Sequence, residues 1–461
     1  VGGGTLDRLH GGGRYGGRVG EKMDYRVWGK GFEHEAFKMT NGSGARESWQ
    51  SRHGGVRTDW RLTSRDALTV QGEFYQLSEE ELADRKQGGD LLMRWTRQLP
   101  HAADFSLQFF YDRNVQPHFE ESDIYDLDWH HRFRLTQGQE INWGLGFRQV
   151  DIRLENGSLI SWQPPARSDR TVSLFVQDEI ALAGNDLKLT VGSKVEHNDY
   201  TGLEWQPGAR LLWHVAEGHT LWSALSRAVR IPSYTDTGFH LVTPLTPATT
   251  LRIQGNPEFS EETVWAYELG YRTQPAARLS LDVAAFHNRY DNLGTYENQP
   301  ASFNPVTRVV TLGQTFANKA KGSTHGLETA VNWQAMDHWK LRASHTWLKM
   351  NLNLVDNSTD TSTVASANDI PRHQWQIRSY LDLPHDLELD AALYHVAPLT
   401  HLDIPALARL DLRLGWRAGN NVRFSLSAHN LLDGQHPEFQ GTSIRNSEIP
   451  RSYFARLDWS F

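Results

Sequence analysis

Apolar and polar residues alternate with a period of two in segment after segment of this chain. The C-terminal stretch 451–461 is representative. From position 453 its odd positions are apolar and end in Trp459 and Phe461, while Arg456 and Asp458 occupy even positions. In a β-strand the two sets project to opposite faces, and helical periodicity is not sustained anywhere. The pattern predicts an all-β chain whose strands have one apolar and one polar face.

The connections between these segments alternate between short and long. We count 22 alternating segments, from Val1–Thr5 to Ser452–Phe461. The longest connections are Arg230–Glu262, Leu293–Ser323, Leu352–His373 and Leu432–Arg451. Short turns on one rim and long loops on the other are typical of an outer-membrane β-barrel, and an even strand number places both termini on the short-turn, periplasmic rim. A β-propeller would show a sequence repeat of about 40–50 residues, and we find none.

The composition fits a barrel and excludes several other classes. The chain has 461 residues, 39% of them hydrophobic, and a mean hydropathy of −0.57. No apolar run approaches the roughly 18 residues of a membrane helix. The aromatic content of 11%, with 17 Trp, suits girdles at two membrane interfaces. There is no cysteine, and a net charge of −8 without a basic stripe argues against nucleic acid as a partner.

A series of short motifs resembles those of TonB-dependent outer-membrane receptors, in the family's order and over nearly the whole chain. The matching stretches are Ser173–Glu179 (SLFVQDE), Ser226–Pro232 (SRAVRIP), Gly255–Glu258 (GNPE) with Glu262, Tyr267–Gly270 (YELG), Phe286–Asp291 (FHNRYD), Gly326–Glu328 (GLE), Asn430–Asp433 (NLLD) and the terminal Phe461.

The resemblance implies a 22-stranded antiparallel transmembrane barrel over residues 1–461, with a lumen that the family fills by an N-terminal plug. Because the first expected strand begins at Val1, we expect neither the plug nor the TonB-binding box in this chain. The family imports scarce nutrients, most often ferric siderophores, with energy delivered through TonB. The implied partners are outer-membrane lipid and lipopolysaccharide, the barrel-assembly machinery that reads Phe461, TonB through the absent N-terminal segment, and a small metal chelate.

Two other functions stay open at this level. A barrel of this width without a plug would act as a passive, porin-like channel. A barrel-borne enzyme such as a protease or lipase would need a nucleophile or an acid–base set at the rim. No such set is visible in the sequence, so we expect no enzymatic activity and no cofactor.

Aromatic residues in the otherwise polar long loops are the candidate ligand-binding residues. They are Trp162, Phe239, His240, Tyr296 and Phe303. Aromatic side chains at such positions can grip a siderophore or a corrin ring. The alternative is that they pack one loop against another over the barrel mouth.

The charged residues yield no metal site from their spacing. Asp126 and Asp128 share a face and are a possible calcium pair, although carboxylates on a lumen wall are more commonly just solvated. His130 and His131 project to opposite faces and cannot chelate together. The run Glu79–Glu81 is expected as a solvated charge run in an external loop, with calcium bridging to lipopolysaccharide as the alternative. By the resemblance, lumen-facing basic residues pair with lumen acids and with the plug: Lys188, Lys194, Arg409, Arg413 and Arg423.

Overall fold

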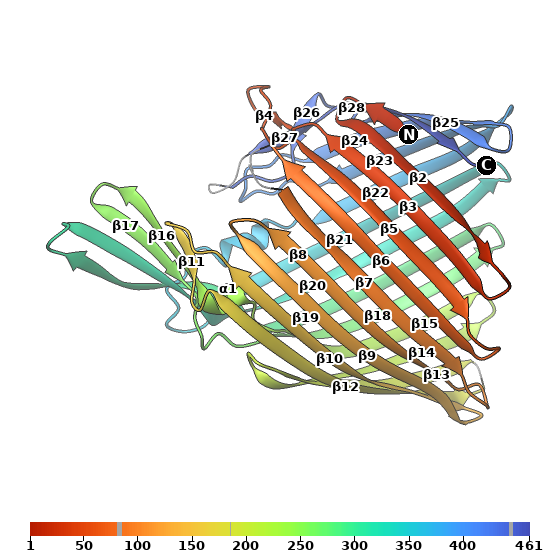
Figure 1. Cartoon of the computed structure of the whole chain (residues 1–461), viewed down its shortest axis with the longest axis horizontal. Helices are drawn as coiled ribbons and strands as arrows, with labels where there is room; N and C mark the ends of the chain where they lie inside the picture. Colours follow the sequence, from red (N-terminus) through yellow and green to blue (C-terminus); the bar gives the residue numbers. More distant parts are fainter. Residues whose placement is uncertain (81–84, 185, 442–445) are drawn as a thin grey trace.

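The computed structural model describes residues 1–461 except 81–84, 185 and 442–445, and most of these residues form a closed barrel (Figure 1). One sheet of 25 strands contains the 22 antiparallel strands of the wall and three strands, β11, β16 and β17, outside it. The expected all-β class and wall-strand number are confirmed. The wall strands are β1 (Gly2–Gly4), β2 (Asp7–Val19), β3 (Met23–His34), β5 (Trp49–Arg61), β6 (Asp66–Glu79), β7 (Arg85–Gln98), β8 (Asp104–Gln116), β9 (Glu120–Thr136), β10 (Gln139–Leu154), β12 (Ala166–Ala183), β13 (Leu187–Asn198), β14 (Gly202–Ala216), β15 (His219–Arg230), β18 (Glu262–Ala276), β19 (Leu279–Asn304), β20 (Val309–Met336), β21 (Trp339–Leu354), β22 (His373–Leu383), β23 (Leu387–Val396), β24 (Leu407–Ala418), β25 (Val422–His429) and β28 (Ser452–Trp459).

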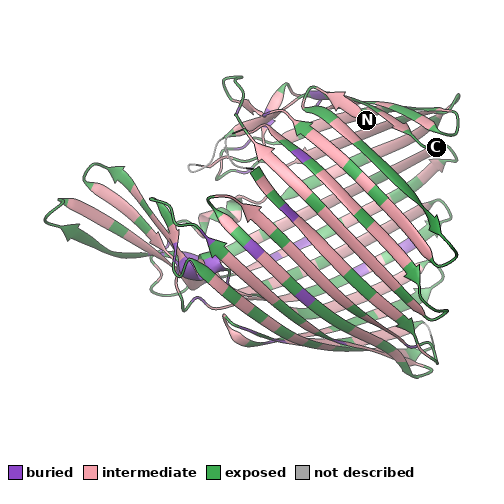
Figure 2. Cartoon of the chain, viewed as in Figure 1, coloured by how far each residue is buried: buried purple, intermediate pink, exposed green. Residues whose placement is uncertain are grey.

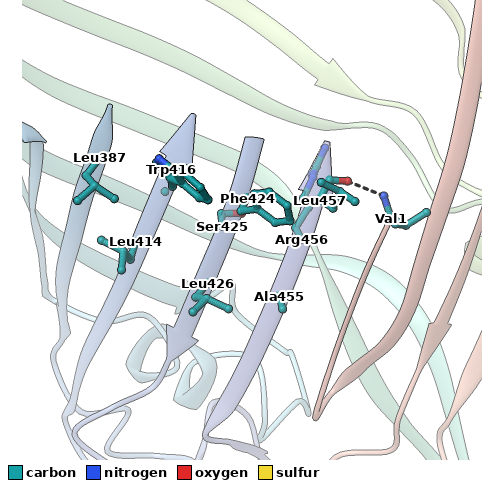
Figure 3. A pocket seen from close by; sticks show the side chains of 11 residues that line it. Val1, Leu387, Leu414, Trp416, Phe424, Ser425, Leu426, Ala455, Arg456 and Leu457 are labelled. Atoms are coloured by element: carbon teal, nitrogen blue, oxygen red, sulfur yellow. Dashed lines mark hydrogen bonds between the residues drawn. The ribbon is translucent and has the colours of Figure 1, made fainter. Parts of the chain in front are cut away.

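The ring closes where the first and last strands meet. Gly2–Gly4 of β1 pair with Phe454–Arg456 of β28, and the amino group of Val1 donates a hydrogen bond of 2.8 Å to the carbonyl of Leu457 (Figure 3). Closure pairs the two strands that would otherwise be edges, as backbone groups inside a bilayer require. Beside the seam, apolar side chains line a hollow: Leu387, Leu414, Trp416, Phe424 and Leu426 (Figure 3).

Apolar side chains cover the outside of the wall, and polar ones face the lumen. Exposed residues are spread over the whole wall (Figure 2), and on β12 they alternate with partly buried ones. Large apolar side chains on the outer face are highly accessible: Leu426 is 61% exposed and Trp416 48%. In a membrane, lipid and not water covers this band, so these apolar side chains do not pay the free-energy cost of contact with water. The polar faces meet the aqueous lumen.

The inner wall is held by ion pairs. Each basic residue that the sequence predicts for the lumen has a carboxylate partner there, which agrees with the expectation from the family resemblance. The pairs are Lys188 with Glu179 (2.8 Å), Lys194 with Glu196, Arg409 with Asp411 (2.7 Å), Arg413 with Asp390 (2.7 Å) and Arg423 with Glu388 (3.9 Å).

The two rims differ as expected. Short turns such as 20–22, 217–218 and 419–421 join strands at one rim. Gly218 and Gly419 adopt φ values of 72° and 76° in these turns, a left-handed conformation that glycine reaches without steric cost. The other rim carries the long connections. Among the described residues, no helix is long and apolar enough to cross a membrane.

Two segments expected as loops contain regular structure. The sequence predicts a loop over Leu293–Ser323, but β19 and β20 continue through it to a turn at 305–308. Pro300 argues against a strand, yet it lies in a bulge between Gln299 and Ser302, where a missing backbone N–H is tolerated. The connection expected over Arg230–Glu262 likewise contains α1 (Tyr234–Gly238), β16 (Phe239–Thr246) and β17 (Thr249–Gln254).

These elements build a sheet that extends away from the barrel mouth (Figure 1, left). β11 (Ile160–Trp162) pairs with β16, and β16 pairs with β17. β17 runs parallel to the outer part of β20, which pairs with the outer part of β19. We call these five strands the projecting sheet. In other connections lie a small sheet of β4 (Lys38–Met39), β27 (Ser447–Pro450) and β26 (Gln435–Pro437), and the 3-10 helix η1 (Ala365–Asn368).

The strand register also answers the questions about charged residues. His130 lies opposite Gly144 and the next residue, His131, opposite Trp143, so the two histidines project to opposite faces, as expected. Asp126 accepts a hydrogen bond of 2.6 Å from Arg148. In the described part of the chain, no group of three or more His, Cys, Asp or Glu residues is placed to hold a metal ion. Glu81, the last residue of the acidic run, lies outside the described residues.

The assignment of faces predicts opposite outcomes for two neighbours on β12. Leu174 is 46% exposed on the outer face, whereas Ser173 faces the lumen opposite Gly146 and Glu196. We expect Leu174→Arg to lower the free energy of unfolding by about 2–4 kcal/mol, because it places a charge in lipid. Ser173→Arg should change it by less than about 0.5 kcal/mol. Urea titration in lipid vesicles measures both, and equal losses would contradict the assigned faces.

Candidate functional site at the long-loop rim

A row of five aromatic rings crosses the base of the projecting sheet. Phe119 packs on Trp162 with ring centroids 5.7 Å apart, and Trp162 packs on Phe239 at 5.9 Å. Phe239 stacks on Phe316 at 6.4 Å, and Phe316 meets Tyr296 at 5.1 Å. These separations lie in the range where aromatic pairs attract, about 4.5–7 Å. The row therefore links β16 and β11 to the long hairpin β19–β20.

A glycine beside this row packs closely against α1. Gly255 follows β17, and its N–H donates to the carbonyl of Phe239 at 2.6 Å. A Cβ on Gly255 would lie only 2.7 Å from the backbone of Thr237. A side chain does not fit there without movement of α1. The first glycine of the GNPE motif thus has a packing role.

Arg230 connects the barrel rim to the base of the projecting sheet. Its Nε donates to Glu262 at 2.7 Å, and its Nη1 donates to Asp236 of α1 at 2.9 Å. The other oxygen of Glu262 accepts the N–H of Gly294 on β19 at 2.7 Å. Asp236 also forms a capping box with Ser233 at the start of α1. Motif residues of the rim therefore position α1 and the long hairpin.

Buried residues gather at this junction (Figure 2). Leu154, Trp162 and Tyr234 form a buried cluster, against which Ile152 and Phe239 pack. The cluster holds α1 and the base of β11 on the end of β10. The projecting sheet is thus fixed at its base and free of the barrel at its tip (Figure 1).

The projecting sheet has one apolar and one polar face. The register places Leu241 beside Ile253, Leu251 beside Leu312, and Phe303 beside Val310 on one face. The alternate positions form the other face and are mainly polar, for example His240, Arg252, Gln254, Thr311 and Glu297. On the apolar face Phe303 is 62% exposed and Leu312 41%. An accessible apolar surface of this kind is a common feature of binding sites.

The structure brings together most of the predicted ligand-binding residues. Trp162, Phe239 and Tyr296 belong to the aromatic row, and Phe303 lies farther out on the same face. His240 lies on the opposite face, with its Nδ1 3.2 Å from the carbonyl of Gly238. Trp162 is only 6% exposed and packs loop against loop, whereas Tyr296 is 44% exposed and accessible.

Sequence reasoning missed Phe119 and Phe316, which complete the row. Phe316 is part of an alternating run, Val310, Leu312 and Phe316, within the segment expected as a loop. That alternation was the available signal. Phe119 lies in the tight turn between β8 and β9 and carries no pattern that predicts its contact with Trp162.

The connection between β21 and β22 is held to β19 by two buried carboxylates. Glu297 is 4% exposed and accepts hydrogen bonds from Thr359 N–H and Ser358 Oγ, both at 2.7 Å. Asp360 is 5% exposed and accepts the N–H of Tyr296 at 2.7 Å. Burial alone would raise the pKa of each carboxyl, but these hydrogen bonds outweigh it and lower both pKa values to about 2.

The comparison with known families covers nearly the whole chain. The family described as "TonB dependent receptor-like, beta-barrel" matches residues 4–431. This chain belongs to that family. The chain is therefore an outer-membrane β-barrel of the TonB-dependent receptor family. The members of this family are transporters and not enzymes.

Solved structures and a curated relative share the fold. The siderophore receptor PirA from Acinetobacter baumannii superposes with a TM-score of 0.79 at 13% identity, over 99% of this chain and 79% of that one. A ferric enterobactin receptor (PfeA) mutant from Pseudomonas aeruginosa, in complex with enterobactin, gives 0.77 at 17%, over 100% and 80%. The FrpB iron transporter from Neisseria meningitidis gives 0.76 at 10%, over 100% and 80%. An iron-regulated outer membrane virulence protein from Vibrio cholerae is 25% identical over 38% of this chain and 26% of its own length.

The two buried carboxylates predict an acid-sensitive attachment. Because their folded pKa values are depressed, they stabilise the attachment above about pH 4, and this contribution is lost as pH falls toward 2. Hydrogen exchange, corrected for intrinsic rates, should show the amides of Tyr296 and Thr359 losing at least about tenfold in protection between pH 7 and pH 2.5. Asp360→Asn should reproduce the loss at Tyr296 at pH 7. Unchanged protection in acid would contradict the assignment.

Proposed function

We propose that this barrel belongs to an importer of a ferric siderophore, energised through TonB by a part of the protein outside these residues. The observation that carries the proposal is the accessible apolar face of the projecting sheet, with Tyr296 and Phe303, at the mouth of a wide barrel. Family membership supports the role of a TonB-dependent receptor. The assignment of a ferric siderophore as its substrate goes beyond family membership and is our proposal.

The chemistry of such a ligand fits this surface. A ferric siderophore presents flat chelating groups or apolar backbone around a metal that is already enclosed. Aromatic side chains bind such faces by stacking and by apolar contact, without ligating the metal. Relatives of similar fold point the same way: their names describe siderophore receptors, a ferric enterobactin receptor and an iron transporter.

Uptake against a gradient needs work that a hydrogen-bonded ring of strands does not itself supply. In the family this work is transmitted by TonB, and we assign the same source here. The matched segment covers 26% of the length of the Vibrio cholerae relative and 79–80% of the compared receptor chains. The activity of the whole protein therefore remains part of the proposal.

Ligand binding can be measured on the refolded barrel in detergent. Intrinsic tryptophan fluorescence would be titrated with ferric enterobactin, ferrichrome and ferric aerobactin, each against its iron-free form. We expect saturable quenching by at least one ferric complex. Phe303→Ala and Tyr296→Ala should each weaken its binding about two- to tenfold, the value of one aromatic contact.

Two matched variants control this experiment. His240→Ala removes a ring from the polar face of the same sheet and should leave affinity within about twofold. Phe424→Ala removes a ring from the lipid-facing wall, where Phe424 is 43% exposed, and should have no effect. Loss of binding on His240→Ala, with Phe303→Ala unaffected, would move the site to the opposite face. Absence of binding for all three complexes would count against the siderophore proposal.

A further inference from the structure

Three neighbouring cations of the inner wall lack the acidic partner that the other lumen cations named above possess. Lys340 and Arg342 lie on β21, and Arg378 lies on β22, all on the lumen face. In the described part of the chain, none of the three has a carboxylate oxygen within 4.0 Å. Arg342 is directly opposite Arg378 in the register, and Lys340 is opposite Tyr380. Like charges directly opposite on neighbouring strands repel and destabilise the sheet.

Tyrosine rings pack against these guanidinium groups. The guanidinium carbon of Arg342 lies 5.7 Å from the ring centre of Tyr380, and that of Arg378 lies 5.6 Å from Tyr394. Such contacts orient an arginine without neutralising it. The Nε of Arg378 is buried and has no hydrogen-bond partner. A buried donor without an acceptor costs free energy, which an anion at this point would recover.

Carboxylates on β23 and β24 are already engaged by other cations. Asp390 accepts from Arg413 at 2.7 Å, and Asp411 accepts from both Nε and Nη2 of Arg409 at 2.9 and 2.7 Å. Glu388 meets Arg413 and Arg417. The carboxylates of β23 and β24 therefore do not pair with the three cations. Asp382 of β22, also among the described residues, shares the lumen face but forms no ion pair with any of them.

The far wall of the lumen carries a group of three carboxylates. Glu73, Asp90 and Asp112 lie side by side on β6, β7 and β8. Counted along the ring of 22 wall strands, β21 is the eleventh strand after β7, so the two groups face each other across the barrel. An anion in the lumen is repelled from one wall and attracted to the other. Each effect acts locally, because the Debye length is about 8 Å at physiological salt.

We propose that Arg342, Arg378 and Lys340, with Tyr380 and Tyr394, form a binding site for a multivalent oxyanion on the inner wall. Guanidinium groups bind carboxylate or phosphate oxygens in pairs, and an anion between Arg342 and Arg378 converts their repulsion into two attractions. The ligand chemistry is a cluster of carboxylates or a phosphate. Its source is either a free solute in the lumen or the acidic side chains of a polypeptide segment lodged there. The site does not depend on what the projecting sheet binds.

The test uses citrate and pyrophosphate as probes and the refolded barrel in a zwitterionic detergent. Isothermal titration calorimetry at low salt should show saturable binding of at least one probe, with affinity falling as salt is raised. Arg342→Gln and Arg378→Gln should each weaken binding about tenfold or more. Arg378→Lys keeps the charge but loses the planar fork, so its affinity should fall between those of wild type and Arg378→Gln.

The control is a lone lumen cation of the same wall. Arg210 on β14 lies opposite Thr190 and Ala224, with no second cation in its register. Arg210→Gln removes the same charge and should leave binding within about twofold. The proposed site would be overturned if the wild type showed no saturable binding. It would also be overturned if Arg210→Gln and Arg378→Gln weakened binding equally, because that result would mean that only the net charge of the lumen matters. Heat-modifiable migration in gels verifies that each variant is folded.

A competition experiment then distinguishes the two sources of the anion. A short oligoglutamate peptide that displaces citrate with higher affinity assigns the site to polypeptide carboxylates. Citrate binding that the peptide leaves unchanged assigns it to small solutes. Both results require that citrate binds to the wall. If it binds at the proposed site, citrate binding and its displacement by the peptide are both lost in Arg342→Gln.

Discussion

The pairing of β1 with β28 is the constraint on which the rest of this structure depends. Inside a bilayer each backbone N–H and C=O needs a partner from the protein, and a sheet meets this need only when its two edges join. Once the ring is closed, every wall strand has a lipid side and a lumen side. The outer Leu, Val and Trp residues and the inner ion pairs are consequences of that geometry. The rims are the places where backbone can leave the ring, and there the projecting sheet is built.

The functional surfaces use two different kinds of local chemistry. At the mouth, five aromatic rings from five separate segments meet in one row, beside the close packing of Gly255 on α1 and the ion pairs of Arg230. Inside the lumen, many cations form ion pairs with wall carboxylates, whereas Lys340, Arg342 and Arg378 lie together beside carboxylates of β23 and β24 that other cations engage. The first surface suits flat or apolar ligand faces, and the second suits oxyanions.

The alternation of residue types was sufficient to predict the wall, its faces, its strand number and its two unequal rims, because a period of two is a local property. It failed over Leu293–Ser323, where Pro300 and a polar composition concealed two strands. The aromatic row was out of reach for another reason. It depends on the parallel pairing of β17 with β20 and on the contact of Phe119 with Trp162, which join residues far apart in the chain. The candidate ligand-binding residues could be found from the sequence because they are aromatic residues in polar loops. Which face of the projecting sheet each of them occupies depends on the strand register, which the sequence did not provide.

The length of β20 has a mechanical consequence. This strand runs without interruption for 28 residues, about 90 Å at the usual rise, from the outer tip of the projecting sheet to the opposite rim. Outside the barrel it is bonded to β17, and within the wall it is bonded to β21, which carries Arg342. Its pairing with β19 changes register between Leu293 and Thr295, but no loop separates its outer part from its wall part. The outer surface and the strand next to the unpaired cations are therefore joined by one continuous backbone, so a movement of the tip reaches the wall without crossing a flexible connection.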